Sequence, residues 1–244
     1  MNLGKLRQTP NAPLFGGEGG LVDPVSPARA LFNEILSRYA NAPDDLAIMP
    51  STIVSEVELP AALNVQDIVW NLRADQANPS NPIRTTEVRL QTRDAFVIDR
   101  IGLFFGVQVS GDPASAVYYQ QYDNPHTVAN SGFSTTGAQA VRQAYNGSLY
   151  SIVNTVQYIA GVHASQFRYV DTAQASTAVL RSAQENSFGY VDLTPAMTVR
   201  GSDSSQFTLR IPDPALFTTG GDEIIVARLM LRGMLVQGGA QFEL

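Results

Sequence analysis

The sequence contains no cysteine and only two histidines, and both shortages exclude classes of site. Without cysteine the chain can form no disulfide, no thiolate metal site and no cysteine nucleophile. His126 and His163 lie far apart in the sequence and have no acidic ligand pattern nearby, so a three-histidine zinc site is impossible. We therefore expect no metal and no other cofactor, and stability must come from packing and association.

Positive charge is also scarce: Lys5 is the only lysine, the fifteen arginines are scattered, and the net charge is -6. A protein that coats nucleic acid needs clustered cations to neutralise phosphates, so we expect no specific nucleic-acid binding. Charged residues make up 16% of the chain, whereas they make up about a quarter of an average soluble domain. Such a weakly charged surface suits burial against neighbouring molecules.

Long apolar runs are missing as well. No stretch approaches the roughly 18 consecutive apolar residues that cross a bilayer as a helix, and residues 1–13 lack the apolar core of a secretion signal. The sequence therefore predicts a soluble protein that is made in the cytoplasm and is not exported by that route.

Three regions follow one another along the chain. Residues 1–25 contain three prolines and two glycine pairs with few apolar side chains, so we interpret them as an extended arm, with a frayed terminus as the alternative. In residues 26–43, Ser26 and Pro27 predict a helix start, and apolar residues recur at helical spacing to about residue 40. This amphipathic helix would clamp the bottom of a barrel or dock on a neighbour. The third region, residues 44–244, is the main domain.

From residue 51 onward the apolar period changes to two, which indicates half-buried strands. The alternation is clearest at 53–59, 86–91 and 207–211. Two longer segments, 95–109 and 223–236, are apolar on both faces and are expected in the middle of a sandwich. Further strands are expected at 66–73, 115–121, 148–159, 188–192 and 196–200, and helices at 136–145 and 173–184. The pattern predicts an all-β sandwich of about nine to twelve strands with short helical insertions.

Catalytic constellations are weak. The carboxylate pairs that resemble a glycosidase acid and nucleophile are Asp44-Asp45, Glu56/Glu58 and Asp222-Glu223. Glu56 and Glu58 fall on the polar face of a strand, where solvated or interface charges are the usual occupants. No nucleophile, base and orienting group can be combined, and two distant histidines cannot supply the metal ligands of a cupin enzyme. We expect no catalytic, cofactor-binding or metal-binding residues, and no enzyme.

Three other motifs have structural interpretations. The glycine run at 15–20 lacks the spacing of a dinucleotide loop and follows no strand, so a flexible hinge is the better interpretation. The Asn-Gly-Ser sequence at 146–148 fits a glycosylation acceptor, but a tight turn into a strand is favoured. The third motif is a candidate sugar-stacking platform that consists of Tyr118, Tyr119 and Tyr122, with His126 nearby. Tyrosines on a strand with an apolar period of two more often fill a core or cover an interface than bind sugar.

Several segments between residues 92 and 240 share a pattern with a known family. They are TRDAFVIDRIGLFFGV (92–107), YNGSLYSIVNTVQYI with FRYVDTAQ (145–159 and 167–174), and LTPAMTVRGSDSSQFTLRIP with EIIVARLMLRGMLVQGGA (193–212 and 223–240). In pattern, more than in any invariant motif, they resemble the jelly-roll capsid proteins of small tailless icosahedral bacteriophages, particularly the membrane-containing ones of the finnlakevirus kind.

The resemblance implies a shell protein of the virion that forms capsomers with copies of itself. Its strands would stand roughly perpendicular to the shell, its loops would make the outer surface, and its arm would reach under neighbours. Other virion proteins would be partners, and contact with an internal membrane is a further option. The resemblance brings no catalytic residues.

The number of jelly rolls is left open by the sequence. Major capsid proteins of that phage group tend to contain two rolls, which need about sixteen strands. After the arm and the helical stretches are removed, fewer than about 170 residues remain for strands and loops, which favours a single roll with insertions. A compact double jelly roll is the alternative.

The sequence therefore predicts a structural viral capsid protein, foremost a major capsid protein, that self-assembles into an icosahedral shell. The alternative is a carbohydrate-binding module, such as a receptor-recognition spike or a fibre head. A hydrolase on a β-sandwich scaffold ranks last, because no catalytic triplet can be assigned.

Overall fold

The computed structural model describes residues 27–38, 47–61, 63–72, 90–109, 117, 119–121, 133–168, 189–219 and 223–241. Most of its elements are strands. In chain order the elements are α1 (Pro27–Arg38), β1 (Ala47–Leu59), β2 (Val65–Asn71), β3 (Ala95–Val109), α2 (Thr135–Tyr145), β4 (Ser148–Val153), β5 (Val156–His163), η2 (Ala164–Phe167), β6 (Tyr190–Arg200), β7 (Ser205–Ala215), β8 (Glu223–Gln237) and η4 (Gly239–Gln241).

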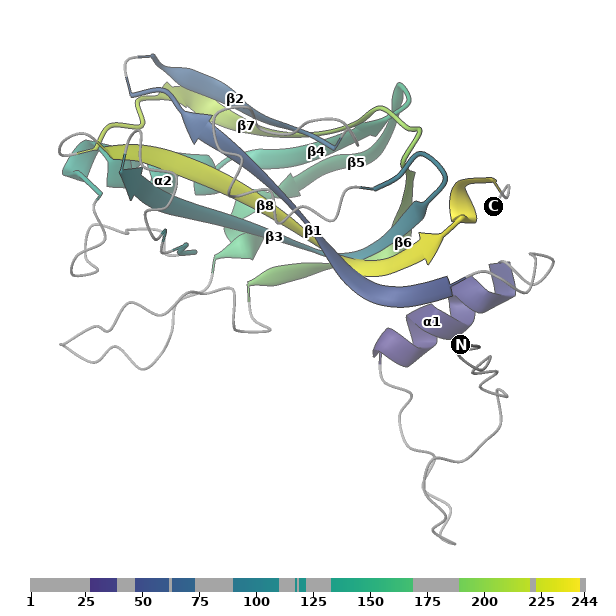
Figure 1. Cartoon of the computed structure of the whole chain (residues 1–244). Helices are drawn as coiled ribbons and strands as arrows, with labels where there is room; N and C mark the ends of the chain where they lie inside the picture. The colour runs from purple at the N-terminus through teal and green to yellow at the C-terminus, as the bar shows by residue number, and fades with distance from the viewer. Residues whose placement is uncertain are drawn as a thin grey trace, which may run out of the picture.

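The eight strands of the described residues form two antiparallel sheets that face each other (Figure 1). The first sheet has the order β1-β8-β3-β6, and the second has the order β2-β7-β4-β5. The pairing is nested, because β1 pairs with β8, β2 with β7, β3 with β6 and β4 with β5. The all-β sandwich predicted from the sequence is confirmed.

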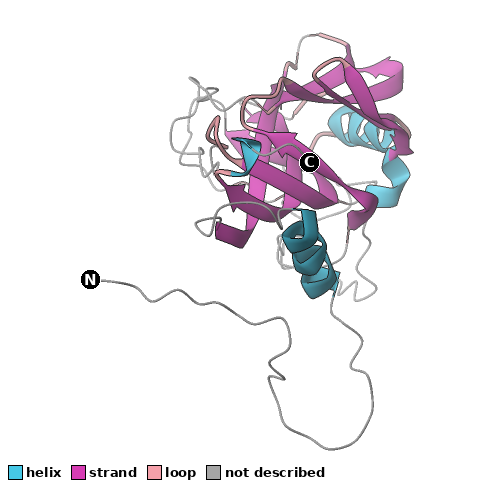
Figure 2. Ribbon diagram, turned by 90° about the vertical axis from the view of Figure 1, so that its right-hand side faces the viewer, coloured by secondary structure: helices cyan, strands magenta, loops and turns pink. Residues whose placement is uncertain are grey.

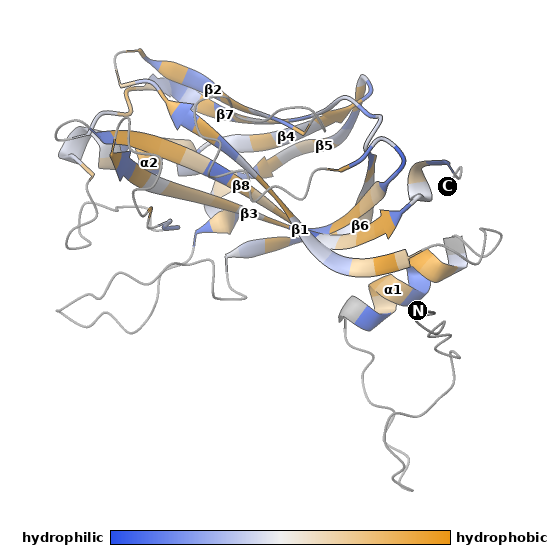
Figure 3. Cartoon of the chain, viewed as in Figure 1, coloured by the Kyte–Doolittle hydropathy of each residue, from blue (hydrophilic) through white to orange (hydrophobic). Residues whose placement is uncertain are grey.

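The core lies between the two sheets, where the inward side chains of alternate residues meet. Ile225, Leu229 and Leu231 of β8 are fully buried and belong to this core, as their period of two predicts. The strands β3 and β8 occupy the middle of the first sheet, as expected for segments that are apolar on both faces. Figure 3 shows the long apolar stretches along β8.

The helix α2 packs its buried face into the same core. Its start is capped by Ser134, whose hydroxyl oxygen accepts a hydrogen bond of 3.0 Å from the Gly137 amide. At the start of β4, a side chain on Gly147 would place its Cβ 2.4 Å from the carbonyl oxygen of Arg210, so only glycine fits there. The expected tight turn at 146–148 is confirmed.

The helix α1 lies on the outer face of the first sheet (Figures 1 and 2). Leu31 and Ile35 are buried there, in a cluster with Val97 of β3 and with Met234 and Val236 of β8. The predicted amphipathic helix is confirmed, but it covers a sheet face rather than the bottom of the barrel.

One predicted strand is wrong. Residues 148–159 do not form a single strand, because β4 and β5 make a hairpin that turns at Asn154 and Thr155. Both residues have positive φ, 47° and 72°, as a two-residue hairpin turn requires. Asparagine tolerates this conformation, whereas β-branched threonine rarely adopts it. The turn contains no glycine, which is the residue by which such a turn is usually recognised in a sequence.

The segments predicted separately at 188–192 and 196–200 form one strand, β6. Its pairing with β3 slips, since Ile98 pairs with Met197 whereas Arg100 pairs with Asp192, and the residues between form a bulge. The segments at 66–73, 95–109, 136–145 and 223–236 match β2, β3, α2 and β8 within two residues.

Other expectations fall partly or wholly outside the described residues. Of the strand expected at 115–121, residues 117 and 119–121 are described, and among them Gln120 forms an isolated bridge with Phe105 rather than part of a longer strand. Most of 86–91, the helix at 173–184 and the arm at 1–25 lie outside the described part of the chain.

Candidate functional site

The carboxylate candidates do not form a paired site in the described residues. Glu58 is exposed on β1, and Glu223 begins β8 opposite Val109. The remaining candidates, Asp44, Asp45 and Asp222, lie outside the described part of the chain. Glu56 is different, because its side chain is only 12% exposed.

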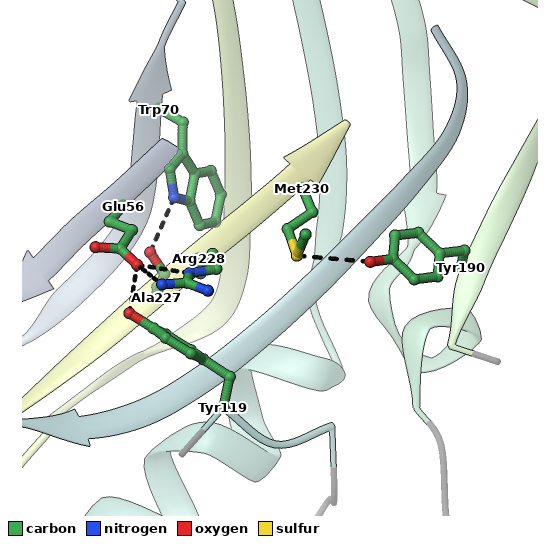
Figure 4. A network of polar contacts seen from close by, with 7 residues as sticks. All are labelled: Glu56, Trp70, Tyr119, Tyr190, Ala227, Arg228 and Met230. Carbon is green, nitrogen blue, oxygen red and sulfur yellow. Dashed lines mark hydrogen bonds and ion pairs between the residues drawn. The ribbon is translucent and has the colours of Figure 1, made fainter. Parts of the chain in front are cut away.

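Glu56 belongs to a network on the outer face of the first sheet (Figure 4). It lies opposite Arg228 in the pairing of β1 with β8, and the Arg228 Nε donates a hydrogen bond of 2.5 Å to the Glu56 Oε1. The Tyr119 hydroxyl donates to the same oxygen. The Arg228 guanidinium lies 3.5 Å from the centre of the Tyr119 ring, a cation–π contact.

The interpretation of Glu56 as a solvated or interface charge is therefore wrong. Its position on the outer face of β1 is as predicted, but Tyr119 covers that part of the face. The charge of this carboxylate is balanced by the guanidinium, and one of its oxygens accepts hydrogen bonds from the guanidinium and the phenol. This arrangement fixes a loop on a sheet, so we assign it a structural role.

A second apolar cluster surrounds this ion pair and comprises Phe104, Tyr119, Val226 and Met230. Tyr190 borders the cluster. Its hydroxyl donates to the Met230 sulfur at 3.5 Å, its ring meets Phe104 edge-on, and Arg232 lies 4.0 Å from its ring centre. Burial raises the pKa of the Tyr190 phenol. The outer face of the first sheet is thus packed at two places, by α1 and by Tyr119.

The tyrosine platform considered from the sequence is not available at Tyr119, which is 2% exposed. The structural interpretation, in which such tyrosines fill a core, holds for this residue. Tyr118, Tyr122 and His126 lie outside the described residues. His163 ends β5, where its Nδ1 accepts from the Ser165 amide and lies 2.6 Å from the Ser165 hydroxyl oxygen, so it caps η2.

A cleft of about 690 Å³ lies between the edge strands β5 and β6, which belong to different sheets. Its walls are a nearly continuous stretch of β5 and the middle of β6. The residues that line it are Val153, Asn154, Val156, Tyr158, Ile159, Ala160, Gly161, Val162, Leu193, Thr194, Pro195, Ala196, Met197, Thr198, Arg200 and Asp203.

One end of the cleft is held by a polar clamp between two turns. The Asn154 side-chain amide donates to the Asp203 Oδ1 at 2.6 Å, and the Ser204 amide donates to the Asn154 Oδ1 at 2.9 Å. The Arg200 main-chain amide donates to the other carboxylate oxygen of Asp203 at 2.8 Å. These bonds fix the β4–β5 turn against the β6–β7 turn.

Sequence reasoning missed this cleft. Asn154, Tyr158 and Asp203 stand in no recognisable motif. Asn154 and Asp203 meet because their turns lie at the end of the β4–β7 pairing, and Tyr158 lines the same cleft because β5 and β6 are the edges of two facing sheets. The one local signal is the absence of Asp, Glu, Lys and Arg between Arg142 and Arg168. An uncharged segment that contains exposed strand residues indicates a surface that contacts something other than water.

No protein-family model matches the sequence, and no curated protein matches it either. Within the described ranges, no helix has the length and apolar character to cross a membrane. In the same part of the chain, no group of three or more histidine, cysteine or acidic side chains is placed to hold a metal ion. The function of the chain is therefore to be inferred from its fold and its surfaces.

Proposed function

We propose that the chain is a structural shell subunit, a single jelly-roll capsid protein that assembles with copies of itself into an icosahedral shell. The nested strand pairing carries this proposal. A jelly roll has eight strands in two facing sheets, and capsid proteins are among the proteins built on it. Winding an antiparallel ribbon of four strand pairs into two sheets produces the observed order of pairs, from β1 with β8 to β4 with β5.

A single roll fits the described strands better than a double roll. Two rolls need about sixteen strands, whereas the described residues contain eight in one pair of sheets. The residues outside the described ranges do not form one continuous stretch, because they are divided among the N-terminus and several connections between elements. The proposal is therefore for one roll per chain.

Fold alone does not assign function, because jelly rolls also occur in lectins and in cupins. In this chain the space between the sheets is filled by fully buried side chains that include Trp70, Tyr145 and Phe207. The Trp70 indole and the Tyr145 hydroxyl donate to main-chain carbonyl oxygens, at 3.1 Å and 3.3 Å. A filled interior directs recognition to the outer surface, which favours a protein whose role is assembly.

The surface beside α1 is the favoured contact between copies. Leu36 on α1 is 42% exposed and Met49 on β1 is 38% exposed, although the adjacent Ile35 is buried and the adjacent Ile48 is partly buried in the cluster between α1 and the sheet. Burying exposed apolar side chains against a neighbour is favourable. Residues 1–25 precede α1 directly, so we propose that they extend the same contact to adjoining subunits of the virion.

Electron microscopy of the purified full-length protein, together with sedimentation velocity over a range of concentrations, tests the shell proposal. We expect closed shells or regular capsomers whose fraction rises with concentration. Leu36→Glu should weaken this assembly, because it places a charge in the contact, whereas Gln143→Glu, an equal charge change on an exposed position of α2, should not. A chain that stays monomeric at every concentration and ionic strength would contradict the proposal.

A further inference from the structure

The cleft between β5 and β6 supports an inference that is independent of shell assembly. We propose that it is a saccharide-binding site in which a neutral pyranose ring stacks on Tyr158 and hydrogen-bonds to Asp203 and Arg200. The carbohydrate-stacking function considered for other tyrosines is thereby assigned to a different part of the chain.

The dimensions of the cleft suit a small ligand. Its volume of about 690 Å³ lies within the range of roughly 300–1,000 Å³ that is typical of small-molecule sites. Its two walls are strands of different sheets, and each strand is anchored by main-chain pairing near both of its ends. The site therefore exists without its ligand, which lowers the entropy cost of binding.

Both walls lose their regular pairing at the cleft. On β5, Ile159 pairs with Ser151 and Gln157 pairs with Ile152, so Tyr158 is an extra residue without a partner position. On β6, residues 193–196 have no partner positions on β3, and all four line the cleft. Bulges redirect side chains and are common beside binding sites. Here the bulged residues line the cleft and have no partner in the strand pairing.

Tyr158 provides the apolar contact of the site. Its side chain is 55% exposed although it lines the cleft, and no Asp, Glu, Lys or Arg occurs on β4 or β5. A tyrosine ring presents a broad apolar face with a polar tip. Its natural complement is a flat ligand with an apolar face and a polar rim. A pyranose ring has this shape, because its axial C–H bonds point out of the ring faces and its equatorial hydroxyls lie around the edge.

The clamp at the end of the cleft provides the polar contacts. Asp203 accepts one hydrogen bond at each carboxylate oxygen, from Asn154 and from the Arg200 main chain. A carboxylate can accept about four, so acceptor positions remain for ligand hydroxyls. Within the described residues the Arg200 guanidinium has no ion-pair partner, and its planar fork can donate to two neighbouring hydroxyls.

The charge balance of the cleft selects a neutral ligand. Among the described residues that line it, Arg200 and Asp203 alone are charged, and their formal charges cancel. An anionic or cationic ligand would bring one uncompensated charge into the site. A neutral saccharide satisfies both side chains through hydroxyl groups that donate and accept.

Methionine-methyl NMR of the full-length protein gives a direct test. Met197 lines the cleft, whereas Met49, Met230 and Met234 lie on the first sheet outside it and serve as internal controls. The probes are methyl α-glucopyranoside, methyl α-mannopyranoside, methyl β-galactopyranoside and methyl β-N-acetylglucosaminide. We expect at least one of them to shift the Met197 methyl resonance saturably and to leave the other three unchanged. Glycerol, which has hydroxyls but no ring face, should shift none.

Two variants separate ring stacking from general exposure. Tyr158→Ala should weaken the affinity about tenfold, as expected for the loss of an aromatic contact. Ile152→Ala, which removes an exposed apolar side chain of the same hairpin outside the cleft, should leave the affinity unchanged. The proposal is overturned if no pyranoside shifts Met197, or if the two variants weaken binding equally. Neither outcome bears on shell assembly, which is measured separately.

Discussion

The indole nitrogen of Trp70 donates a hydrogen bond of 3.1 Å to the carbonyl oxygen of Ala227, and this bond joins the two sheets. Trp70 lies on β2 of the second sheet, and Ala227 lies on β8 of the first sheet (Figure 4). The Trp70 side chain is fully buried. A core contact of this kind fixes the distance between the sheets and satisfies a polar atom that has no access to water.

Trp70→Phe should lower the free energy of unfolding because phenylalanine buries a smaller ring. It should lower it by about 1–3 kcal/mol more, because it leaves a buried carbonyl without this donor. Circular dichroism in a urea series measures the change, since Trp70 is the only tryptophan and the variant loses its fluorescence probe. Tyr158→Phe, which removes a polar group from an exposed ring, should change stability little. Equal effects of the two variants would show that the bond to Ala227 contributes nothing.

The ion pair between Glu56 and Arg228 should contribute more than a surface pair. Its side chains are 12% and 16% exposed, whereas those of Asp67 and Arg210 are 37% and 62% exposed. We expect Glu56→Gln to cost about 3 kcal/mol, because Arg228 is left without its buried partner. Asp67→Asn should cost less than about 1 kcal/mol.

Salt dependence distinguishes the two pairs further. Raising the ionic strength should reduce the effect of Asp67→Asn and leave that of Glu56→Gln nearly constant, because buried charges are weakly screened. Chemical unfolding at low and high salt measures both. A small, salt-sensitive effect at Glu56 would return this residue to the solvated role that the sequence indicated.

Glu56 shows what the apolar periodicity of a strand can predict and what it cannot. The alternation along β1 correctly placed Glu56 on the face opposite Ile53, but periodicity does not reveal what covers a face. The covering residue, Tyr119, is 63 positions away in the sequence. The central positions of β3 and β8 are predictable because a strand that is buried on both faces is apolar at most of its positions.

The hairpin of β4 and β5 shows a second limit. Its turn uses Thr155 in a conformation that threonine rarely adopts, so the local residues favoured one continuous strand. The cleft was hidden for a related reason, because it requires β5 and β6 to be recognised as separate edges. A site made by the edges of two sheets depends on topology, and local sequence patterns carry little information on topology.

Asp99 should make stability depend on pH. Its pKa is raised above the ordinary 3.8 chiefly because burial penalises the ionised form, while Arg100 acts in the opposite direction. The folded state therefore holds this proton more tightly than the unfolded chain, and stability is lost as the pH rises from 3.8 through the folded pKa.

Asp99→Asn should accordingly raise the melting temperature at neutral pH, and the difference from the wild type should disappear below pH 3.8, where the aspartate is protonated in both states. Differential scanning calorimetry of both proteins at the two pH values checks this. A difference that does not change with pH would mean that ionisation of Asp99 is not its cause.

Two adjacent residues of α1 should respond differently to the same substitution. Ile35 is 1% exposed and packs on the outer face of the first sheet, whereas Leu36 is 42% exposed. Ile35→Ala should cost about 2–5 kcal/mol through lost burial and a cavity, and Leu36→Ala should cost within about 0.5 kcal/mol. Urea unfolding measures both. Similar losses would mean that α1 does not dock on the sheet through Ile35.

Deleting residues 1–25 should separate folding from assembly. The segment has few large apolar side chains, and they are too widely spaced to form a core, so it should add little to the stability of an isolated subunit. Laid along a neighbour, those side chains would be buried one at a time, and the entropy cost of ordering would be offset only in the assembly. The truncated chain keeps α1 and the whole sandwich.

We therefore expect the truncated protein to melt within a degree or two of the full-length subunit, since its core is unchanged, and to form few or no shells. Calorimetry under dissociating conditions and electron microscopy under assembling conditions provide the two measurements. Leu36→Glu is the matched comparison, because it should weaken assembly through a different part of the same surface. A truncated monomer that melts many degrees lower would identify residues 1–25 as part of the folded domain rather than an assembly arm.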